Sequence, residues 1–424
     1  MDFRARARGL PWGAIVFLSA LLTGLAMVFV VFKAQSLADT RPDPYFFGAM
    51  GKSVAHGDGL LPFGSLIKRR APLYPLTIGA LYWTFGEREW LLQLLQCAFH
   101  AGTCWLVFDL GRRMFNLRTG VLAALATALH PLLLRYVPDL HLETQFTFLL
   151  TLSIWQSQRF LEKPDARRGA LLGVTLALAS LTKSVPMLYP FFFAGAVALM
   201  ALRARRGETP AQALRPLVLP LAAMFVLMAA VVSPWTYRNY QTTGHFIPIS
   251  SGGSDAFLRG YIFSRTEFIT YKLLPYTDAE NETNATFRAL CAKEGAVWEQ
   301  DDWQTDQILN RAAKAKLKAE PLLFVRKFVV GLFTFWYELT TLKNALLAAA
   351  LALLAWAFAI PGLLRAKREG RAAWPLWLPI AYTNLLLAAL LALGRYSAPV
   401  LPELMLLAAF GLDGILARRE AARA

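Results

Sequence analysis

Acidic and imidazole side chains gather in one short stretch between two apolar runs. Asp139, His141 and Glu143 fall within five residues. Such groups hold or move protons in catalysis, and an ionisable side chain at the edge of a membrane is a candidate functional group. Glu143 stands at the head of the next apolar run, which favours a functional role for it. The alternative, stronger for Asp139, is a carboxylate that stabilises a helix N-terminus.

Basic side chains occur where polar segments meet apolar runs. Three are consecutive, and cations at this depth suit a phosphate at the level of lipid headgroups. Pairing with anionic phospholipids is the other interpretation. Lys183 interrupts an apolar hairpin, so its ammonium needs a partner, for which a lipid-linked phosphate, Glu143 and the headgroups are the candidates. The candidate phosphate ligands are Lys68, Arg69, Arg70, Lys183, Arg238 and Arg395.

Composition places these residues in a membrane protein. The chain has 424 residues, of which 56% are hydrophobic and 17% charged, and its mean hydropathy is +0.41. Soluble domains are less apolar and more charged, so soluble, disordered and fibrous classes are excluded. The net charge of +16 lies in clusters between apolar runs, which indicates membrane orientation rather than nucleic-acid binding.

Ten apolar runs are long enough to predict spanning helices. A span needs roughly 20 mostly apolar residues. The runs cover residues 12–32, 90–110, 119–136, 144–160, 168–184, 186–202, 215–233, 345–363, 374–393 and 399–416. The sequence therefore predicts an all-α transmembrane fold of about ten spanning helices.

The distribution of Lys and Arg predicts the orientation. With alternate crossing, the segments on one side hold 21 of them, whereas the three short loops on the other side hold only Arg135, Lys183 and Arg395. The positive-inside rule then places both termini in the cytoplasm. It also makes the shorter run Leu73–Phe85 a juxtamembrane or re-entrant helix on the outer face, and Leu322–Tyr337 an outer interfacial helix, because counting either as a span would invert the later loops.

Two long outer segments remain, and they divide the chain into three parts. We expect an N-terminal transmembrane catalytic module at 1–233 that includes the first outer loop at 33–89. An outer, periplasmic loop region follows at 234–344, and C-terminal transmembrane helices occupy 345–424. Within the outer region, Asp301–Glu320 reads as an amphipathic helix stopped by Pro321, and Ser250–Asp255 as a flexible turn.

The order, spacing and sidedness of several short motifs resemble a known class. These are Asp43-Pro44-Tyr45 after the first span, Arg69-Arg70-Ala71-Pro72-Leu73-Tyr74-Pro75, the turn at 111–115, Glu143, Lys183, Pro234-Trp235 with Arg238, and Arg395-Tyr396 with Pro399 and Pro402. The pattern is similar to the GT-C class of integral-membrane glycosyltransferases that use polyprenyl-phosphate sugars. The nearest branch is the one shared by protein O-mannosyltransferases and lipid A aminoarabinose transferases.

The resemblance implies a single displacement at the anomeric carbon of a polyprenyl-phosphate sugar. Asp43 is the implied general base, with Asp39 as a substitute because Pro44 stands where relatives often carry a second acid. Glu143 would orient the acceptor or hold the cations, and two or three of the six cations would touch the phosphate. Further substrate contacts are expected from Tyr45, Asp139, His141 and Tyr396. No cofactor is expected and no metal ion is obligatory, since protein cations supply the charge.

The implied partners are the lipid-linked sugar donor, an acceptor that is a glycolipid, lipopolysaccharide, polysaccharide or protein, and membrane lipids. Nucleic acid is not a partner, and we expect a monomer in the bacterial inner membrane with its active site on the periplasmic face. The alternatives are a transporter or flippase of a lipid-linked sugar and a structural subunit of an envelope assembly. No internal repeat is visible and the acids cluster on one face, which favours the enzyme.

Overall fold

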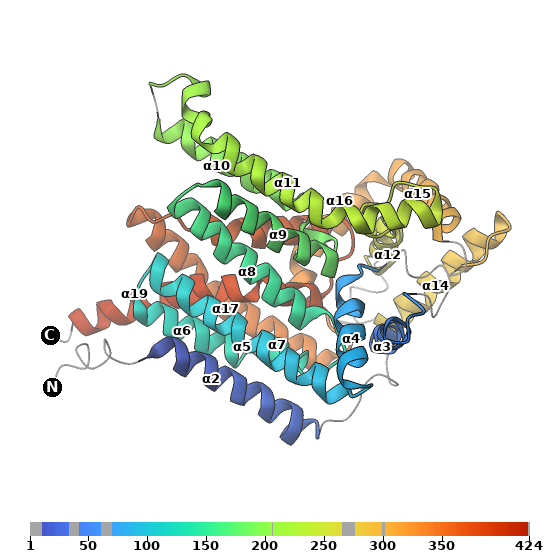
Figure 1. Cartoon of the computed structure of the whole chain (residues 1–424), viewed down its shortest axis with the longest axis horizontal. Coiled ribbons are helices and arrows are strands. Elements are labelled where there is room, and N and C mark those ends of the chain that lie inside the picture. Colours follow the sequence, from blue (N-terminus) through green and yellow to red (C-terminus); the bar gives the residue numbers. More distant parts are fainter. Residues whose placement is uncertain are drawn as a thin grey trace.

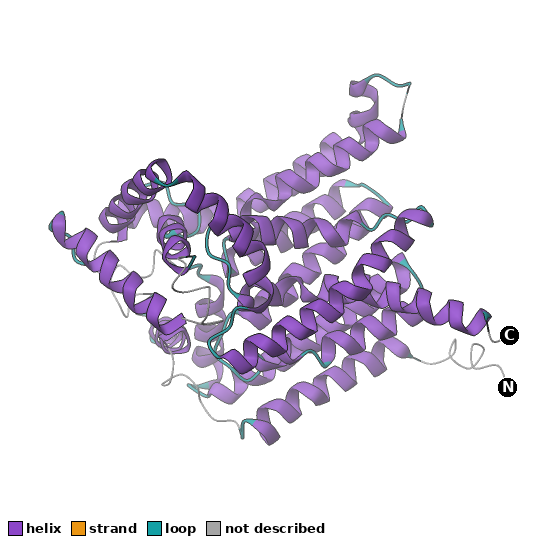
Figure 2. Ribbon diagram, turned by 180° about the vertical axis from the view of Figure 1, so that it is seen from behind, coloured by secondary structure: helices purple, strands orange, loops and turns teal. Residues whose placement is uncertain are grey.

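Every regular element of the structure is helical. The computed structural model describes residues 11–33, 42–60, 70–205, 207–264, 276–298 and 302–422. Within these ranges it contains 17 α-helices, two 3₁₀ segments and one π-helical turn, and no strand. Figure 2 shows this helical character throughout the part of the chain that is described. The predicted all-α transmembrane class is therefore confirmed.

The N-terminal part alternates long helices with short surface helices. Its elements are α2 (Trp12–Leu25), η1 (Ala26–Val31), α3 (Pro42–Ala55), α4 (Leu73–Phe85), α5 (Glu89–Met114), α6 (Leu117–Ala128), α7 (Pro131–Arg135), α8 (Glu143–Glu162), α9 (Ala166–Thr182), η4 (Val185–Leu188), α10 (Tyr189–Ala204) and α11 (Pro210–Thr243). The C-terminal part has α12 (Gly253–Phe263), α14 (Tyr276–Lys293), α15 (Asp302–Ala319), α16 (Pro321–Tyr337), α17 (Leu342–Arg368), α18 (Trp374–Ala389), η5 (Gly394–Val400) and α19 (Leu401–Ala421).

Six of the described helices are long and apolar enough to cross a membrane. They are α2 with η1, α5, η4 with α10, α11, α17, and η5 with α19. The other four predicted runs also fold as helices at their predicted positions, in α6 with α7, α8, α9 and α18. The count of ten spans stays a prediction.

The helices form a bundle with a helical cap at one end. In Figure 1, α2 begins and α19 ends at the left, whereas α3, α4, α12, α14 and α15 gather at the right. The cap has its own small apolar core, which includes Leu258, Phe287, Trp298 and Leu309. The bundle thus has a termini end and a cap end.

Small residues let two pairs of bundle helices approach closely. A Cβ atom at Gly173 of α9 would lie 2.1 Å from the carbonyl oxygen of Met224 in α11, and one at Gly411 of α19 would lie 2.0 Å from that of Phe358 in α17. Small residues of this kind are typical of helix contacts in membranes, where close van der Waals packing holds helices together. These contacts fix the bundle against which the cap is placed.

The structure confirms three of the predicted surface helices. α4 has the predicted bounds, preceded by Pro72 and ended at Gly86, whose φ of 81° favours glycine. α15 and α16 occupy the two predicted outer helices and meet at Glu320, with Pro321 at the first position of α16.

Two local predictions need correction. The run 119–136 is not one helix, because α6 ends at Ala128 and the side chain of His130 caps a separate helix α7 that begins at Pro131. The predicted turn at Ser250–Asp255 is shorter than expected, since α12 begins at Gly253 after Gly252, whose φ is 107°. The break after α6 leaves Arg135 at the end of the separate helix α7 and Tyr136 at its C-cap.

Candidate functional site

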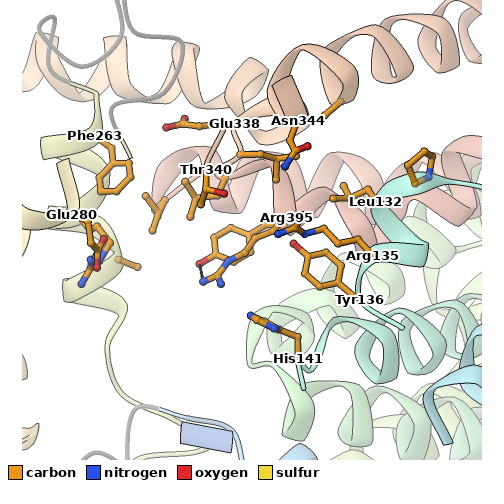
Figure 3. Close-up of a pocket in the computed structure, with 18 of the residues that line it drawn as sticks. Leu132, Arg135, Tyr136, His141, Phe263, Glu280, Glu338, Thr340, Asn344 and Arg395 are labelled. Atoms are coloured by element: carbon orange, nitrogen blue, oxygen red, sulfur yellow. Dashed lines mark hydrogen bonds and ion pairs between the residues drawn. The ribbon is translucent and has the colours of Figure 1, made fainter. Parts of the chain in front are cut away.

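A cavity of about 1030 Å³ lies at the cap end, between the bundle and the cap helices. Its bundle wall is formed by α7, the loop that leads to α8, and η5. Its cap wall is formed by α12 and α14, and the link between α16 and α17 closes one side. Figure 3 shows Arg135, Tyr136, His141 and Arg395 on one side and Phe263 and Glu280 across from them.

Two buried glutamines hold the loop that carries Asp139 and His141. The side-chain amide of Gln96 donates to the carbonyl oxygens of Val137 and Asp139, at 3.0 and 2.7 Å, and that of Gln93 donates to Pro138 at 2.9 Å. Both glutamines come from α5. The loop is therefore fixed to the bundle by satisfied hydrogen bonds, which rigidifies the side chains it presents.

Asp139 and His141 form a buried pair beside the cavity. Nδ1 of His141 lies 3.2 Å from Oδ2 of Asp139. Asp139 is fully buried, whereas His141 lines the cavity. The carboxylate of Asp139 thus lies behind the imidazole, although Nδ1 of His141 makes no hydrogen bond with a described residue. His141 is thus the member of the pair that can reach a ligand.

Glu143 lies in the first turn of α8 with 3% of its surface exposed. Its Oε2 atom has no hydrogen-bond partner among the described residues. The side chain lines a small void that shares Tyr136 with the large cavity. Buried polar atoms are normally paired, so an orphaned carboxylate oxygen is a candidate for a functional contact.

Three cations from separate parts of the chain line the cavity. The guanidinium of Arg70 stacks over Phe46 and Phe47 of α3, at 5.1 and 5.0 Å from the ring centroids. Arg395 donates to the hydroxyl of Tyr396 at 3.2 Å. Arg135 is half-buried and makes no ion pair with a described residue.

The cap wall carries charges that neutralise one another. Arg259 of α12 pairs with Asp255 at 3.1 Å and with Glu280 of α14 at 2.5 Å. Although burial opposes it, the two carboxylates raise the pKa of Arg259. Glu338, half-buried at the end of α16, also lines the cavity, and burial raises its pKa to about 8.

Several predicted residues lie outside the cavity lining. The ammonium of Lys183 sits 4.0 Å from the ring centroid of Tyr396, behind the cavity wall. Arg238 of α11 stacks on Trp235 at 4.8 Å and does not line the cavity. Tyr45 packs against Phe46 and is half exposed.

Some candidates cannot be placed. Asp39, Lys68 and Arg69 lie outside the described residues. Asp43 belongs to the first turn of α3, but the position of its side chain is not described. The helix itself packs on the loop that carries Asp139 and His141, because Phe47 and Leu140 share one apolar cluster.

The sequence interpretation missed Arg135, the Asp255–Arg259–Glu280 group and Glu338. Arg135 was counted only as one of three outer cations, although its position three residues before Pro138 could have identified it as a candidate site residue. The other residues come from segments with ordinary surface charge patterns. Within the described ranges, no group of three or more His, Cys, Asp or Glu side chains could hold a metal ion.

Comparison with known proteins gives one family match and several structural matches. Residues 69–237 match the family model of dolichyl-phosphate-mannose-protein mannosyltransferase. No curated protein sequence matches the chain. The family match contains α4 to α9 and therefore both the His141 loop and Glu143.

The structural matches include an archaeal oligosaccharyltransferase. The Archaeoglobus fulgidus AglB structure with an inhibitory peptide and a dolichol-phosphate matches with a TM-score of 0.57 and 14% identity, over 97% of this chain and 51% of that one. Its apo form matches with a TM-score of 0.58, again at 14% identity and with 97% and 51% coverage. This chain thus spans about half the length of that oligosaccharyltransferase.

A second structural match is ArnT from Cupriavidus metallidurans bound to undecaprenyl phosphate. Its TM-score is 0.42 at 16% identity, over 93% of this chain and 77% of that one. The AglB matches establish the shared fold, whereas the ArnT score is too low to add to it.

Proposed function

We propose that this chain is a membrane glycosyltransferase of the GT-C class and that it moves a sugar from a polyprenyl-phosphate donor to an acceptor of the bacterial envelope. The observation that carries the proposal is the convergence of Arg70, Arg135 and Arg395 on one cavity beside the membrane bundle. Cations from three separate elements around one hollow are what a lipid-linked phosphate requires.

The donor phosphate would lie against Arg395 and Arg135 on the bundle wall. Both come from elements next to the spanning helices, so a phosphate there stays continuous with a polyprenyl chain in the lipid. Arg70, held on the rings of Phe46 and Phe47, can approach from the side of α3. Arginine suits this task because its planar fork binds phosphate oxygens in pairs.

The chemical step is one displacement at the anomeric carbon. The oxygen of the acceptor attacks as its proton passes to a general base, and the bond between the anomeric carbon and the phosphate oxygen breaks with its electron pair. The leaving polyprenyl phosphate gains negative charge, which the arginines stabilise. We assign the base to Asp43, with Asp39 as the substitute, and the orientation of the acceptor to Glu143 and the His141–Asp139 pair.

Location and partners follow from the same assignment. The cavity lies at the end of the bundle remote from the chain termini, and the positive-inside pattern assigns that end to the periplasm. The acceptor is then a glycolipid, lipopolysaccharide, polysaccharide or protein outside the inner membrane. The arginines make a metal ion unnecessary for charge neutralisation, and we expect a monomer.

The test is transfer by the purified full chain. It is incubated with a panel of polyprenyl-phosphate sugars and a native envelope extract, and the products are separated by mass. We expect one donor to give a product heavier by one sugar residue. Movement of the lipid-linked sugar across vesicles with no covalent product would instead identify a transporter.

A variant of Asp43 tests the assignment of the base. Asp43→Asn should abolish transfer and leave donor binding intact, because the amide cannot accept the proton. Near-normal turnover by this variant would move the role to Asp39 or Glu143. Donor affinity is measured in parallel, with the product polyprenyl phosphate as competitor.

A further inference from the structure

A second large cavity lies at the termini end of the bundle. It has a volume of about 820 Å³ and runs between the C-terminal half of α17 and α18, with Met200 of α10 and Leu332 of α16 at its edges. The loop that joins α17 to α18 forms one end of it. Arg371 in that loop donates to the carbonyl oxygen of Met114, at the end of α5, which places this loop at the termini end.

α17 separates this groove from the cavity of the proposed active site. Asn344 and Leu351, in its first half, line the large cavity at the cap end. Trp356, Leu364 and Lys367, in its second half, line the groove. A helix of 27 residues is about 40 Å long at 1.5 Å per residue. The two hollows therefore face opposite ends of the bundle.

The groove is apolar along its length and basic at one end. Leu364, Trp377 and Leu385 line it and are 54, 44 and 49% exposed. Lys367 and Arg371 line its end. In a bilayer these exposed apolar walls contact hydrocarbon chains, because a dry void would forfeit their van der Waals contacts.

Positive charge at the basic end is not fully cancelled by the described residues. Glu369 pairs with Arg365 and Arg371, at 2.6 and 2.8 Å, and Arg365 also pairs with Asp413 at 2.9 Å. Lys367 is exposed and makes no ion pair with a described residue. Arg371 is held in place by its contacts with Glu369 and Met114, so the groove presents one ion-paired cation and one, Lys367, that makes no ion pair with a described residue.

We propose that this groove binds an anionic diacyl phospholipid of the leaflet at the termini end. Its phosphate lies against Lys367 and Arg371, and its acyl chains lie along Trp377 towards Leu385. Basic pockets between membrane helices on the cytoplasmic side are suited to anionic headgroups. The bound lipid fills the space between α17 and α18 and braces the helix that carries Asn344 to the active-site cavity.

Polyprenyl phosphate shares this chemistry but is not the assigned occupant. Its phosphate belongs at the cap end under the proposed function, whereas Lys367 at the basic end of the groove lies 23 residues, or about 35 Å, along α17 from Asn344. The groove proposal does not depend on that function, since it is tested by lipid binding alone.

The experiment is native mass spectrometry of the full chain in detergent. The protein is titrated separately with phosphatidylglycerol, phosphatidylethanolamine, a polyprenyl phosphate and inorganic phosphate. We expect one phosphatidylglycerol per chain, bound at least tenfold more tightly than phosphatidylethanolamine, and no adduct with inorganic phosphate. A site that retains polyprenyl phosphate in preference to phosphatidylglycerol would overturn the assignment.

Variants separate the headgroup from the chains. Lys367→Gln should weaken phosphatidylglycerol binding about tenfold, as expected for one charged hydrogen bond, whereas Arg203→Gln, an exposed cation at the end of α10 outside the groove, should leave it unchanged. Ala381→Trp fills the groove and should abolish the adduct with both cations intact. Equal binding by wild type, Lys367→Gln and Ala381→Trp would refute the proposal.

Discussion

The two walls of the candidate active-site cavity differ in how their charges are paired. On the bundle side, Arg135 makes no ion pair with a described residue, and Glu143, in the small void that shares Tyr136 with the cavity, has a buried oxygen without a hydrogen-bond partner among the described residues. On the cap wall, Arg259 satisfies Asp255 and Glu280 together. A cation that is already neutralised gains little from a phosphate, whereas an unpaired one gains much.

This difference divides the work of the site. The bundle wall keeps charge available, as expected where a charged ligand is to be bound. On the cap wall, the ion pairs of Arg259 join α12 to α14 and so set the shape of the cavity. Reaction and donor binding should therefore depend on the bundle wall, and the integrity of the cap on the Arg259 group.

In this comparison of the two walls, the largest expected effect is on turnover and comes from Glu143. Glu143→Gln keeps the size of the side chain but removes the charge with which Glu143 is proposed to orient the acceptor, so we expect kcat to fall about 100-fold. Glu162→Gln is the matched control, because Glu162 ends the same helix in ion pairs with Arg113 and Arg159. Steady-state transfer by both variants measures the contrast.

A Glu143→Gln enzyme with normal kcat would return Glu143 to the role of a carboxylate that stabilises the N-terminus of α8. That result would also remove one of the two features that distinguish the bundle wall. A melting temperature equal to that of wild type is required first, so that a loss of turnover is not a loss of fold.

The sequence predicted the bundle better than the cap. Apolar runs and the turn residues between them located α2, α4 to α6, α8 to α11 and α17 to α19, because burial in lipid demands long uninterrupted segments. They missed α7 as a separate helix, α12, which follows a glycine-rich stretch, and α14, whose composition is too polar for its buried stripe to stand out. By contrast, Pro72 correctly marked the entry to α4, and Pro321 correctly marked the end of α15.

For the site, the sequence predicted which cations share one face of the bundle, but not which of them contact the cavity. Counting outer cations placed Arg135, Lys183 and Arg395 on one face. Which of them enter the cavity depends on the break after α6 and on the turn of η5, and neither changes hydropathy. The Arg259 group was beyond prediction, because its partner Glu280 lies 21 residues away on another helix.

Replacing one arginine on each wall, in separate variants, is expected to have the next largest effect. Arg135→Gln should weaken donor binding about tenfold, the loss of roughly one charge-assisted hydrogen bond, and leave the melting temperature unchanged. Arg259→Gln should do the reverse, because it leaves two partly buried carboxylates facing each other and costs about 2–3 kcal/mol of stability. Donor titration and thermal unfolding of both variants measure the two effects.

The opposite results for these two variants would exchange the roles that we assign to the two walls. If donor affinity falls more in Arg259→Gln than in Arg135→Gln, the Arg259 guanidinium exchanges its carboxylate partners for the phosphate. Loss of stability in Arg135→Gln would show that Arg135 has a structural role. A double variant distinguishes coupling from independent effects, since effects at distant independent sites add.

The smallest expected effect is a pH dependence at the joint between the walls. The ammonium of Lys327 in α16 donates to the carbonyl oxygen of Ala389 in α18 and lies 4.5 Å from the ring centroid of Phe257 in α12. Burial lowers the pKa of Lys327 to about 7, and burial raises that of Glu338, at the end of the same helix, to about 8. Both groups therefore titrate near neutral pH.

The two groups should give opposite slopes of stability against pH. Between about pH 4.5 and 8 the folded chain keeps a proton on Glu338 that the unfolded chain has lost, so stability falls as pH rises. Between about pH 7 and 10.5 the unfolded chain binds a proton on Lys327 that the folded chain lacks, so stability rises, by at most about 1.4 kcal/mol per pH unit. Melting temperature should pass through a minimum between pH 7 and 8. Glu338→Gln should flatten the fall in melting temperature below that minimum, and Lys327→Met should flatten the rise above it. If the rise persists in Lys327→Met, another group, not this joint, holds the cap wall to the bundle wall.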